Sequence, residues 1–319
     1  MPTAAKSLVV ALGGNAISAP DRQGTIGEQF AQTQETARLL CDAILNGYQL
    51  VLTHGNGPQV GNVLRRVEIA RTELYPIPLE VCVADTQAGM GYMIAQCLMN
   101  ELVERNQPQV ASTLVTTVLV DRDDPAFSNP SKPIGPRLTK AVAEAHHRVD
   151  GWEIQQIDDD AFRRIVPSPE PREILEINTI RRIVEAGEQV ICCGGGGIPV
   201  YLNEAGLYQG AAAVIDKDLT TVLLALNLEI STVVILTGVE YVCLDFNKPS
   251  QKALRELRVA EAEQYLEAGQ FGEGSMGPKI GAAIEFLKNS RDDSPQVIIA
   301  ELSKFSEALA GTSGTRITR

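Results

Sequence analysis

The sequence predicts an α/β protein in which helices cover both faces of a mainly parallel sheet. Its length of 319 residues is enough to bury a large hydrophobic core. Short, uniformly apolar runs alternate with helical patterns, which is typical of parallel strands that are buried on both faces. Glycine clusters follow several of these runs, as expected for tight turns at strand ends.

The predicted strands are the apolar runs themselves. In chain order they are SLVVAL (7–12), YQLVLT (48–53), STLVTTVLV (112–120), QVICC (189–193), TVVILT (232–237) and QVIIA (296–300). Between the first two, the segment 27–47 places Phe30, Ala37 and Ile44 at helical spacing and closes with a glycine that can cap a helix. The chain therefore opens with a β-α-β unit.

The segment 121–171 interrupts this rhythm. It contains DRDDPAFSNPSKPIGPRL, the single Trp152 and the proline-rich VPSPEP, with little strand and helix alternation. A long surface connection would also fit, but loops of this length without structure of their own are uncommon and are usually functional when ordered. We therefore expect a small subdomain that forms a lid over the active site.

Composition excludes several classes of protein. A net charge of −12 with no basic stripe disfavours nucleic acid as a partner. The six cysteines form no C-x-x-C pair and lie mostly in apolar runs, so we expect reduced, buried thiols rather than metal ligands. The first strand begins too early for a signal peptide, and no apolar run has the length of a membrane span, so we expect a cytoplasmic protein.

Glycine loops follow four of the predicted strands. One such loop alone would usually be an ordinary tight turn. In an open parallel sheet, however, the carboxyl ends of the strands share one edge where ligands bind, and turns into helix N-termini there suit phosphate or carboxylate. The residues expected to converge are Gly13, Gly14, Asn15, Gly55, Asn56, Gly194, Gly195, Gly196, Gly197 and Gly238.

Two common phosphate-binding motifs are absent. GEGSMGPKI has glycines spaced as in a P-loop, but Pro278 separates Gly277 from Lys279, and Ile280 replaces the hydroxyl residue that would hold magnesium. No G-x-G-x-x-G opens the first helix. A nucleotide, if bound, must be held in another way.

AVIDKD is the next informative stretch, because Asp216, Lys217 and Asp218 interrupt an apolar region at a predicted helix start. The simplest interpretation is a capping aspartate beside a solvated lysine. The functional interpretation is that Lys217 contacts a phosphate in transfer and is oriented by Asp216, since an ammonium neutralises charge that develops on a phosphoryl group.

Several motifs together resemble one known family, the carbamate kinases of the amino-acid kinase superfamily. The resemblance runs in order along the whole chain. The motifs are VVALGGNAI, THGNGPQVGN, NPSKPIGP, VPSPEP, CGGGGIPV, AVIDKD, LTGVEYVC, GSMGPKI and a closing GT.

The resemblance implies a single amino-acid kinase domain over 1–319, an open αβα sandwich from which 121–171 protrudes. Residues up to about 210 would form the carbamate side and a homodimer interface, and residues from about 211 would form the nucleotide side. The implied reaction is reversible phosphoryl transfer, ATP plus carbamate giving ADP plus carbamoyl phosphate. Mg²⁺ would be held mainly by the nucleotide phosphates. In arginine degradation by the arginine deiminase route, such enzymes make ATP.

The resemblance also assigns roles to single residues. Gly13, Gly14 and Asn15 would line the transferring phosphate, and Gly55, Asn56 and the run Gly194 to Gly197 would hold the carbamate. Lys217 and Lys279 would bridge the phosphates, and Asp216 would organise these lysines. Lys132 would be the lysine that the protruding subdomain contributes to the site. Gly238, Tyr241 and Met276 would border the nucleotide, although ordinary packing accounts for the last two equally well.

Two alternatives stay open at this point. A carbamate-kinase-like carbamoyl phosphate synthetase would use the same site in the biosynthetic direction. A nucleotide-binding sensor without catalysis would need no acceptor-side lysine, so the presence of Lys132, Asp216, Lys217 and Lys279 argues against it.

Overall fold

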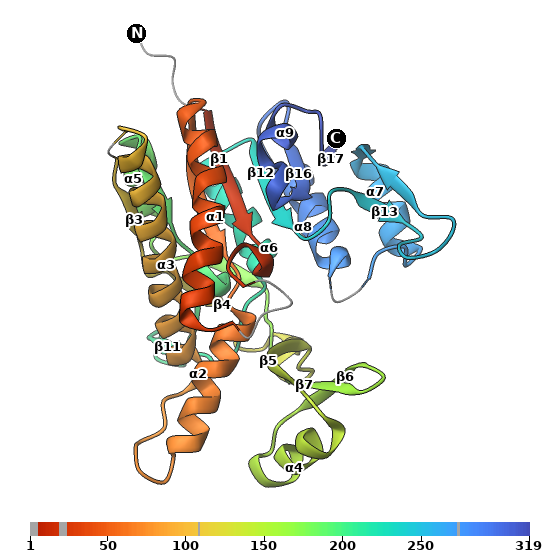
Figure 1. The fold of residues 1–319 in the computed structure, drawn as a ribbon. Coiled ribbons are helices and arrows are strands. Elements are labelled where there is room, and N and C mark those ends of the chain that lie inside the picture. Colours follow the sequence, from red (N-terminus) through yellow and green to blue (C-terminus); the bar gives the residue numbers. More distant parts are fainter. Residues whose placement is uncertain (1–5, 19–23, 108, 273–274) are drawn as a thin grey trace.

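A large sheet covered by helices on both faces forms the body of the protein, and the α/β prediction is confirmed (Figure 1). The computed structural model describes residues 6–18, 24–107, 109–272 and 275–319. Within them the large sheet has eight strands, parallel throughout except where β16 meets β17. In spatial order they are β15 (Glu256–Arg258), β17 (Thr315–Thr318), β16 (Gln296–Glu301), β12 (Thr232–Thr237), β1 (Lys6–Leu12), β2 (Tyr48–His54), β9 (Gln189–Ile191) and β3 (Ala111–Thr113).

The helices divide between the two faces of this sheet. The face with α1, α3 and α9 buries Leu8 and Val10 of the central strand β1, and the face with α5, α6, α7 and α8 buries Val9 and Ala11. Alternation along one strand therefore supplies two separate hydrophobic cores. The helices are α1 (Ile26–Leu45), α2 (Gly57–Ala70), α3 (Leu79–Glu104), α4 (Lys140–Asp150), α5 (Ile177–Glu185), α6 (Lys217–Leu228), α7 (Val259–Glu267), α8 (Met276–Asn289) and α9 (Phe305–Leu309).

The predicted β-α-β unit at the start of the chain is confirmed. Helix α1 begins after Thr25, whose side chain accepts from the backbone N–H of Glu28 while the Glu28 carboxylate accepts from Thr25. This reciprocal capping satisfies two N–H groups at the helix start. The helix ends at Asn46, and Gly47 follows with a φ of 85°, which suits glycine.

The prediction of one strand over STLVTTVLV is wrong. The segment forms β3 in the large sheet and then β4 (Thr117–Val120) in a second sheet. Thr116 lies between them, and its oxygen atoms accept from the backbone N–H groups of Cys193 and Ile198, which flank the glycine run. The chain therefore leaves the first sheet to pack against the glycine loop. The second sheet has the order β11 (Tyr208–Gly210), β10 (Ile198–Leu202), β4 and β8 (Pro171–Ile174).

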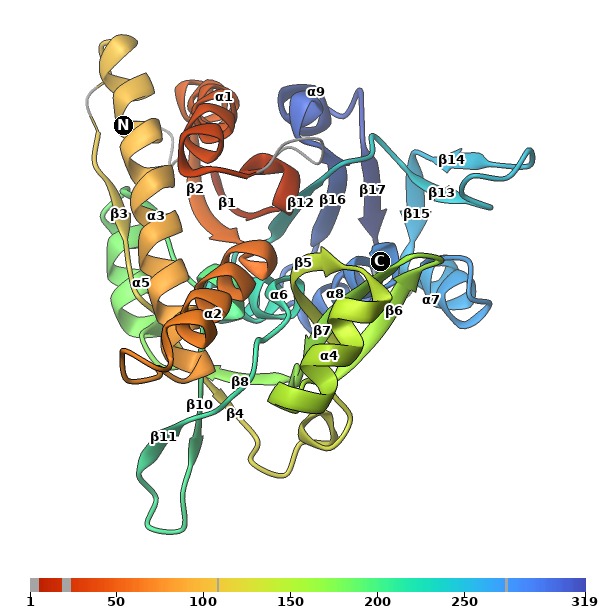
Figure 2. The ribbon, with the colours of Figure 1, turned by 60° about the horizontal axis from the view of Figure 1, so that its bottom comes forward.

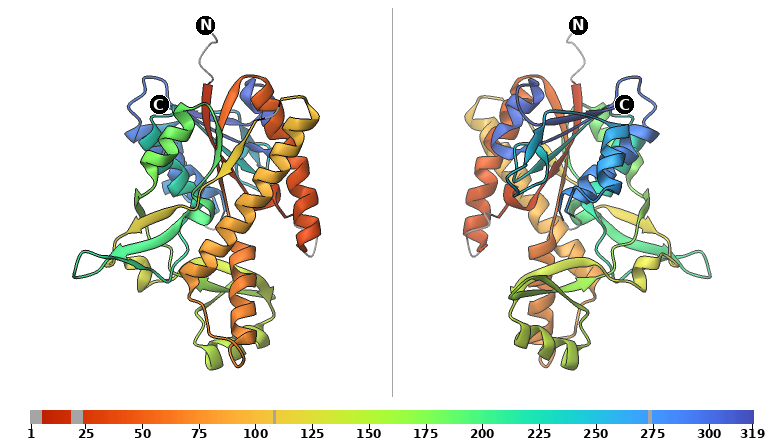
Figure 3. Two further views of the ribbon diagram at one scale, coloured as in Figure 1. Left: turned by 90° about the vertical axis from the view of Figure 1, so that its left-hand side faces the viewer. Right: turned by 90° about the vertical axis from the view of Figure 1, so that its right-hand side faces the viewer.

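The segment 121–171 contains a small sheet and one helix that project from the body at the foot of Figure 1 and of both views in Figure 3, and that lie in front of the body in Figure 2. Its strands are β5 (Lys132–Leu138), β6 (Ile154–Asp158) and β7 (Ala161–Val166), paired in the order β5-β7-β6. Strand β5 packs on α2, where a Cβ on Gly61 would lie 2.0 Å from the Cα of Gly135. The subdomain thus rests on α2 by direct backbone contact.

The remaining elements are short. Strands β13 (Val242–Leu244) and β14 (Lys252–Leu254) form a separate two-stranded antiparallel sheet. Single 3-10 turns occur at η1 (Gly14–Ala16), η2 (Pro125–Phe127), η3 (Gly194–Gly196) and η4 (Leu302–Lys304). Among the described residues, no helix combines the length and the apolar character needed to cross a membrane.

All six cysteines lie in the described part of the chain, and each is a free thiol there. Five are buried, and Cys243 is half-buried in β13. The thiol placement follows the apolar runs, as expected from the sequence.

Candidate active site

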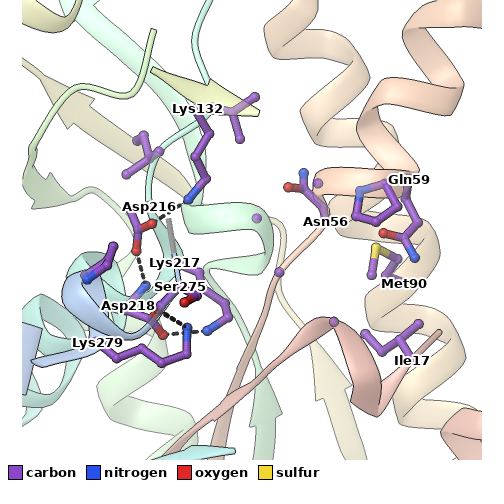
Figure 4. A pocket seen from close by; sticks show the side chains of 18 residues that line it. Ile17, Asn56, Gln59, Met90, Lys132, Asp216, Lys217, Asp218, Ser275 and Lys279 are labelled. Carbon is purple, nitrogen blue, oxygen red and sulfur yellow. Dashed lines mark hydrogen bonds and ion pairs between the residues drawn. The ribbon is translucent and has the colours of Figure 1, made fainter. Parts of the chain in front are cut away.

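A cavity of about 210 Å³ opens at the carboxyl ends of the strands. Gly14, Gly55 and Gly195, from three of the four predicted loops, line it. Figure 4 shows the charged side chains on one side of this cavity, with Asn56, Gln59 and Met90 on the other. The charged residues of the lining are Lys132, Asp216, Lys217, Asp218 and Lys279.

The charges form two clusters around two carboxylates. Asp216 accepts a hydrogen bond from Lys132, which β5 of the subdomain carries across to the body. Asp218 accepts from Lys217 at 2.5 Å and from Lys279 of α8 at 3.1 Å. Four predicted residues from three separate stretches of sequence, Lys132, Asp216, Lys217 and Lys279, therefore meet in one place.

The expected orientation of Lys217 by Asp216 is not what the structure shows, because Asp218 makes that contact. Asp216 instead caps α6 by accepting from the backbone N–H of Asp218 at 2.8 Å, and its other oxygen faces Lys132. The capping bond and the contact with Lys132 thus use both carboxylate oxygens of Asp216. Asp218 had no predicted role, and its one signal in the sequence is that it is a charged residue in an apolar helix start.

Both carboxylates stay ionised at neutral pH. Burial alone would raise the pKa of Asp218, but the ammonium groups of Lys217 and Lys279 outweigh it and hold that pKa well below its usual range. Burial and the nearby carboxylate of Asp218 both raise the pKa of Asp216. The ammonium group of Lys132 outweighs them, so the pKa of Asp216 is also lowered. The cavity thus holds three lysines, two of whose charges are balanced by a single carboxylate.

The run Gly194 to Gly197 is buried and packed against other parts of the protein. A Cβ on Gly194 would lie 2.2 Å from Nε2 of His54, and a Cβ on Gly196 would lie 2.5 Å from the carbonyl oxygen of Ile215. Gly195, Gly196 and Gly197 also have φ values of 66°, 88° and 90°. Glycine is required there by the neighbouring protein atoms and by the backbone conformation. Only Gly195 of this run lines the cavity.

We predict that Gly196→Ala lowers the free energy of unfolding by about 3 kcal/mol, through backbone strain and overpacking against Ile215. Gly206→Ala is the matched control, since Gly206 has a φ of 72° but no atom within 4 Å of the added Cβ. It should cost only about 1 kcal/mol. Urea unfolding of both variants measures the difference. Equal losses of unfolding free energy in the two variants would show that overpacking against Ile215 does not contribute to the destabilisation.

His54 ends β2 beside the glycine run. Burial lowers the pKa of its imidazole to about 4, so the ring is neutral at pH 7. Its Nδ1 lies 3.1 Å from the carbonyl oxygen of Gly55, and its Nε2 is buried without a hydrogen-bond partner among the described atoms. The ring packs directly against Gly194 of the glycine run.

Gly13 and Asn15 flank Gly14 at the end of β1. Gly13 donates to the carbonyl oxygen of Leu236 at 3.0 Å, and a Cβ there would lie 2.6 Å from that oxygen. Gly13 thus joins β1 to β12 closely. Asn15 belongs to the turn η1, and its side chain lies outside the described part of the structure.

A second cavity of about 180 Å³ adjoins the first, and Ser275 and Lys279 line both. Tyr241 and Met276 line the second cavity, as the resemblance implied for residues that border a nucleotide. Gly238 is not in the lining, although Thr237 and Val239 on either side of it are. The lining is otherwise formed by Cys243, Phe246, Gln270, Phe271 and Gly272.

Two further side chains, which no motif predicts, hydrogen-bond the loops that carry Asn56 and Gly194. Thr86 and Gln87 of α3 are buried, and they hydrogen-bond Asn56 and Gly194 respectively. They lie in a regular helix with no motif around them, so no local signal marks them.

Comparison with known proteins places this geometry in a family. The model of the amino acid kinase family matches residues 6–300. The chain is 42% identical to a carbamate kinase of Pyrococcus horikoshii and to the carbamate kinase-like protein YahI of Escherichia coli, with 98% of this chain and of each relative covered. A carbamate kinase structure from Giardia lamblia, bound to AMP-PNP, is 38% identical, has a TM-score of 0.90 and covers 99% of both chains. The chain therefore belongs to the amino acid kinase family, and within it to the carbamate kinases and carbamate kinase-like proteins.

Proposed function

We propose that the protein is a carbamate kinase, which transfers a phosphoryl group reversibly between ATP and carbamate. The observation that carries this proposal is Lys279, which lines both cavities and bonds the same carboxylate as Lys217. A phosphoryl group that passes between the cavities would meet both ammonium groups. Full-length identity of 42% to carbamate kinases supports the same reaction.

The first cavity suits carbamate and the transferred phosphoryl group, and the second suits the nucleotide base and sugar. The Giardia relative is bound to AMP-PNP, which supports a nucleotide ligand for this protein. Lys132 and Lys217 would face the anionic oxygens, which change charge during transfer. Carbamate is already an anion, so the attack needs no general base.

Mg²⁺ is the expected cofactor, and it would neutralise the phosphate oxygens when bound with the nucleotide. The carboxylates that line the first cavity among the described residues are Asp216 and Asp218, and each already accepts from a lysine. This fits an ion that arrives on the nucleotide and is held mainly by its phosphates. It does not favour a site built from protein carboxylates alone.

The wider setting is also a proposal. We propose a cytoplasmic homodimer that makes ATP during arginine degradation by the arginine deiminase route. Exposed Tyr75, Tyr92 and Tyr208, all before residue 210, support an interface in that part of the chain. A synthetase that works in the biosynthetic direction would use the same atoms, and metabolite levels would decide between the two.

Mixing the protein with carbamoyl phosphate and Mg-ADP tests the proposal directly. Rapid formation of ATP is the expected result. Tight binding of ADP with no ATP formed would overturn it and would favour the non-catalytic sensor.

We predict that 121–171 closes over bound substrate. Lys132 reaches the body from this subdomain and bonds Asp216, so ligands in the cavity would add contacts across the same gap. Hydrogen exchange in 121–171 should slow when carbamoyl phosphate and nucleotide are added together. Either ligand alone is the control, and unchanged exchange with both would contradict a lid.

A further inference from the structure

We propose that Thr86 sets the orientation of the Asn56 amide, so that the site selects a substrate with an amino group. Asn56 is a predicted substrate-binding residue that lines the first cavity. Thr86 lies behind it on α3 and is a positioning residue. This inference rests on the proposed function. It adds a structural basis by which the enzyme would prefer carbamoyl phosphate to an acyl phosphate of the same shape.

The contact between the two side chains is well defined. The Nδ2 of Asn56 lies 3.0 Å from the hydroxyl oxygen of Thr86, and both residues are buried, with exposed fractions of 2% and 5%. Gly195 also packs closely against the amide, since a Cβ there would lie 2.3 Å from Nδ2. The amide is therefore held in a narrow slot between α3 and the glycine loop.

The single proton of the Thr86 hydroxyl decides which amide atom faces it. The hydroxyl oxygen lies 2.9 Å from the carbonyl oxygen of Val83 and 3.1 Å from that of Cys82, one turn back along α3. Those carbonyls can only accept, so the hydroxyl proton is used there. Toward Asn56 the hydroxyl can only accept, which selects the amide nitrogen and excludes the amide oxygen.

The amide oxygen is left for the cavity. Asn56 occupies the N-cap position of α2, where an asparagine oxygen usually accepts from the first turn of its helix. Here the side chain makes no capping bond, and no described donor reaches Oδ1. Figure 4 shows this oxygen turned toward the side of the cavity that carries Lys132 and Asp216.

The next residue of α3, Gln87, holds the glycine loop that packs beside this amide. The amide of Gln87 donates to the carbonyl oxygen of Gly194 at 2.9 Å and accepts from the backbone N–H of Thr116 at 2.5 Å. Gln87 thereby fixes the glycine loop, and with it the position of Gly195 beside the Asn56 amide. One helix thus positions both the Asn56 acceptor and the glycine loop that packs beside it.

A fixed acceptor distinguishes between otherwise similar substrates. The lysines of the cavity bind anionic oxygens in any acyl phosphate. An acceptor facing the cavity is satisfied by the N–H of a carbamoyl group and is left unpaired by the methyl of an acetyl group. The structure therefore points to Oδ1 of Asn56 as the group that recognises the substrate nitrogen.

The test compares carbamoyl phosphate with acetyl phosphate as phosphoryl donors to Mg-ADP. In Thr86→Val the shape is kept and the acceptor is lost, so the amide can rotate and present Nδ2 instead. The ratio of kcat/KM for carbamoyl phosphate to that for acetyl phosphate should fall by about tenfold. Thr86→Ser keeps the hydroxyl and should keep the wild-type ratio, which a role in packing alone would not predict.

Asn56→Ala serves if Thr86→Val does not fold, which thermal unfolding reveals. It removes the acceptor outright and should lower the same ratio by at least as much. An unchanged ratio in a folded Thr86→Val, or in Asn56→Ala, would overturn the inference. Absence of ATP formation by the wild-type protein would overturn the proposed function instead, so the two failures are distinguishable.

Discussion

Lys217→Ala should lower kcat by roughly two to three orders of magnitude, with a much smaller change in nucleotide affinity. Lys217 begins α6, and Asp218 holds its ammonium group at 2.5 Å on the cavity wall. A donor held in place before the reaction stabilises charge that develops only in the transition state, so its loss affects turnover more than binding. Steady-state kinetics with Mg-ADP and carbamoyl phosphate separate kcat from KM.

Lys217→Arg is the control that keeps the positive charge but changes the shape of the charged group. We expect it not to restore activity, because the planar guanidinium is bulkier and directs its donors at other angles. Gly55 lies beside this side chain, since a Cβ there would be in van der Waals contact with Cδ of Lys217 at 3.4 Å. If Lys217→Ala keeps near-normal kcat and only raises the KM for ADP, Lys217 is a binding residue and the assignment is wrong.

Asp218→Asn should lower kcat/KM by roughly two orders of magnitude or more. The carboxylate is buried and balances the charges of Lys217 and Lys279, so its neutral isostere leaves two ammonium groups close together without a counter-charge. Both lysines would then move apart and lose their placement between the cavities. Asp245→Asn is the matched control, because Asp245 also accepts from a lysine, Lys248, but at a more exposed position outside the lining of both cavities.

The same carboxylate should contribute to stability in a pH-dependent way. Its pKa in the folded protein is depressed below the ordinary value of 3.8, so its contribution is present above that value and is lost as pH falls below it. Urea unfolding at a series of acidic pH values should show a weaker pH dependence in Asp218→Asn than in the wild type.

For the activity prediction, wild-type turnover in Asp218→Asn would show that Lys217 and Lys279 are placed by other contacts.

The sequence by itself determined the fold class, most of the strands and the loops that reach the cavity. These are local properties, because alternation of apolar runs with helical periodicity reflects burial of each element, and glycine marks the turns between them. The carboxyl ends of parallel strands share one edge, so topology alone brought Gly14, Gly55 and Gly195 together. Motif order along the chain was enough to indicate the family.

Only the tertiary structure decided which groups touch. Asp216 and Asp218 are two residues apart, and their partners Lys132 and Lys279 come from elements more than fifty residues away on either side, so no local pattern could divide the lysines between them. STLVTTVLV had to leave the first sheet because Thr116 supports a glycine loop far along the chain. Such contacts depend on which surfaces meet when separate elements pack, and that information is spread over the whole chain rather than held in any one stretch.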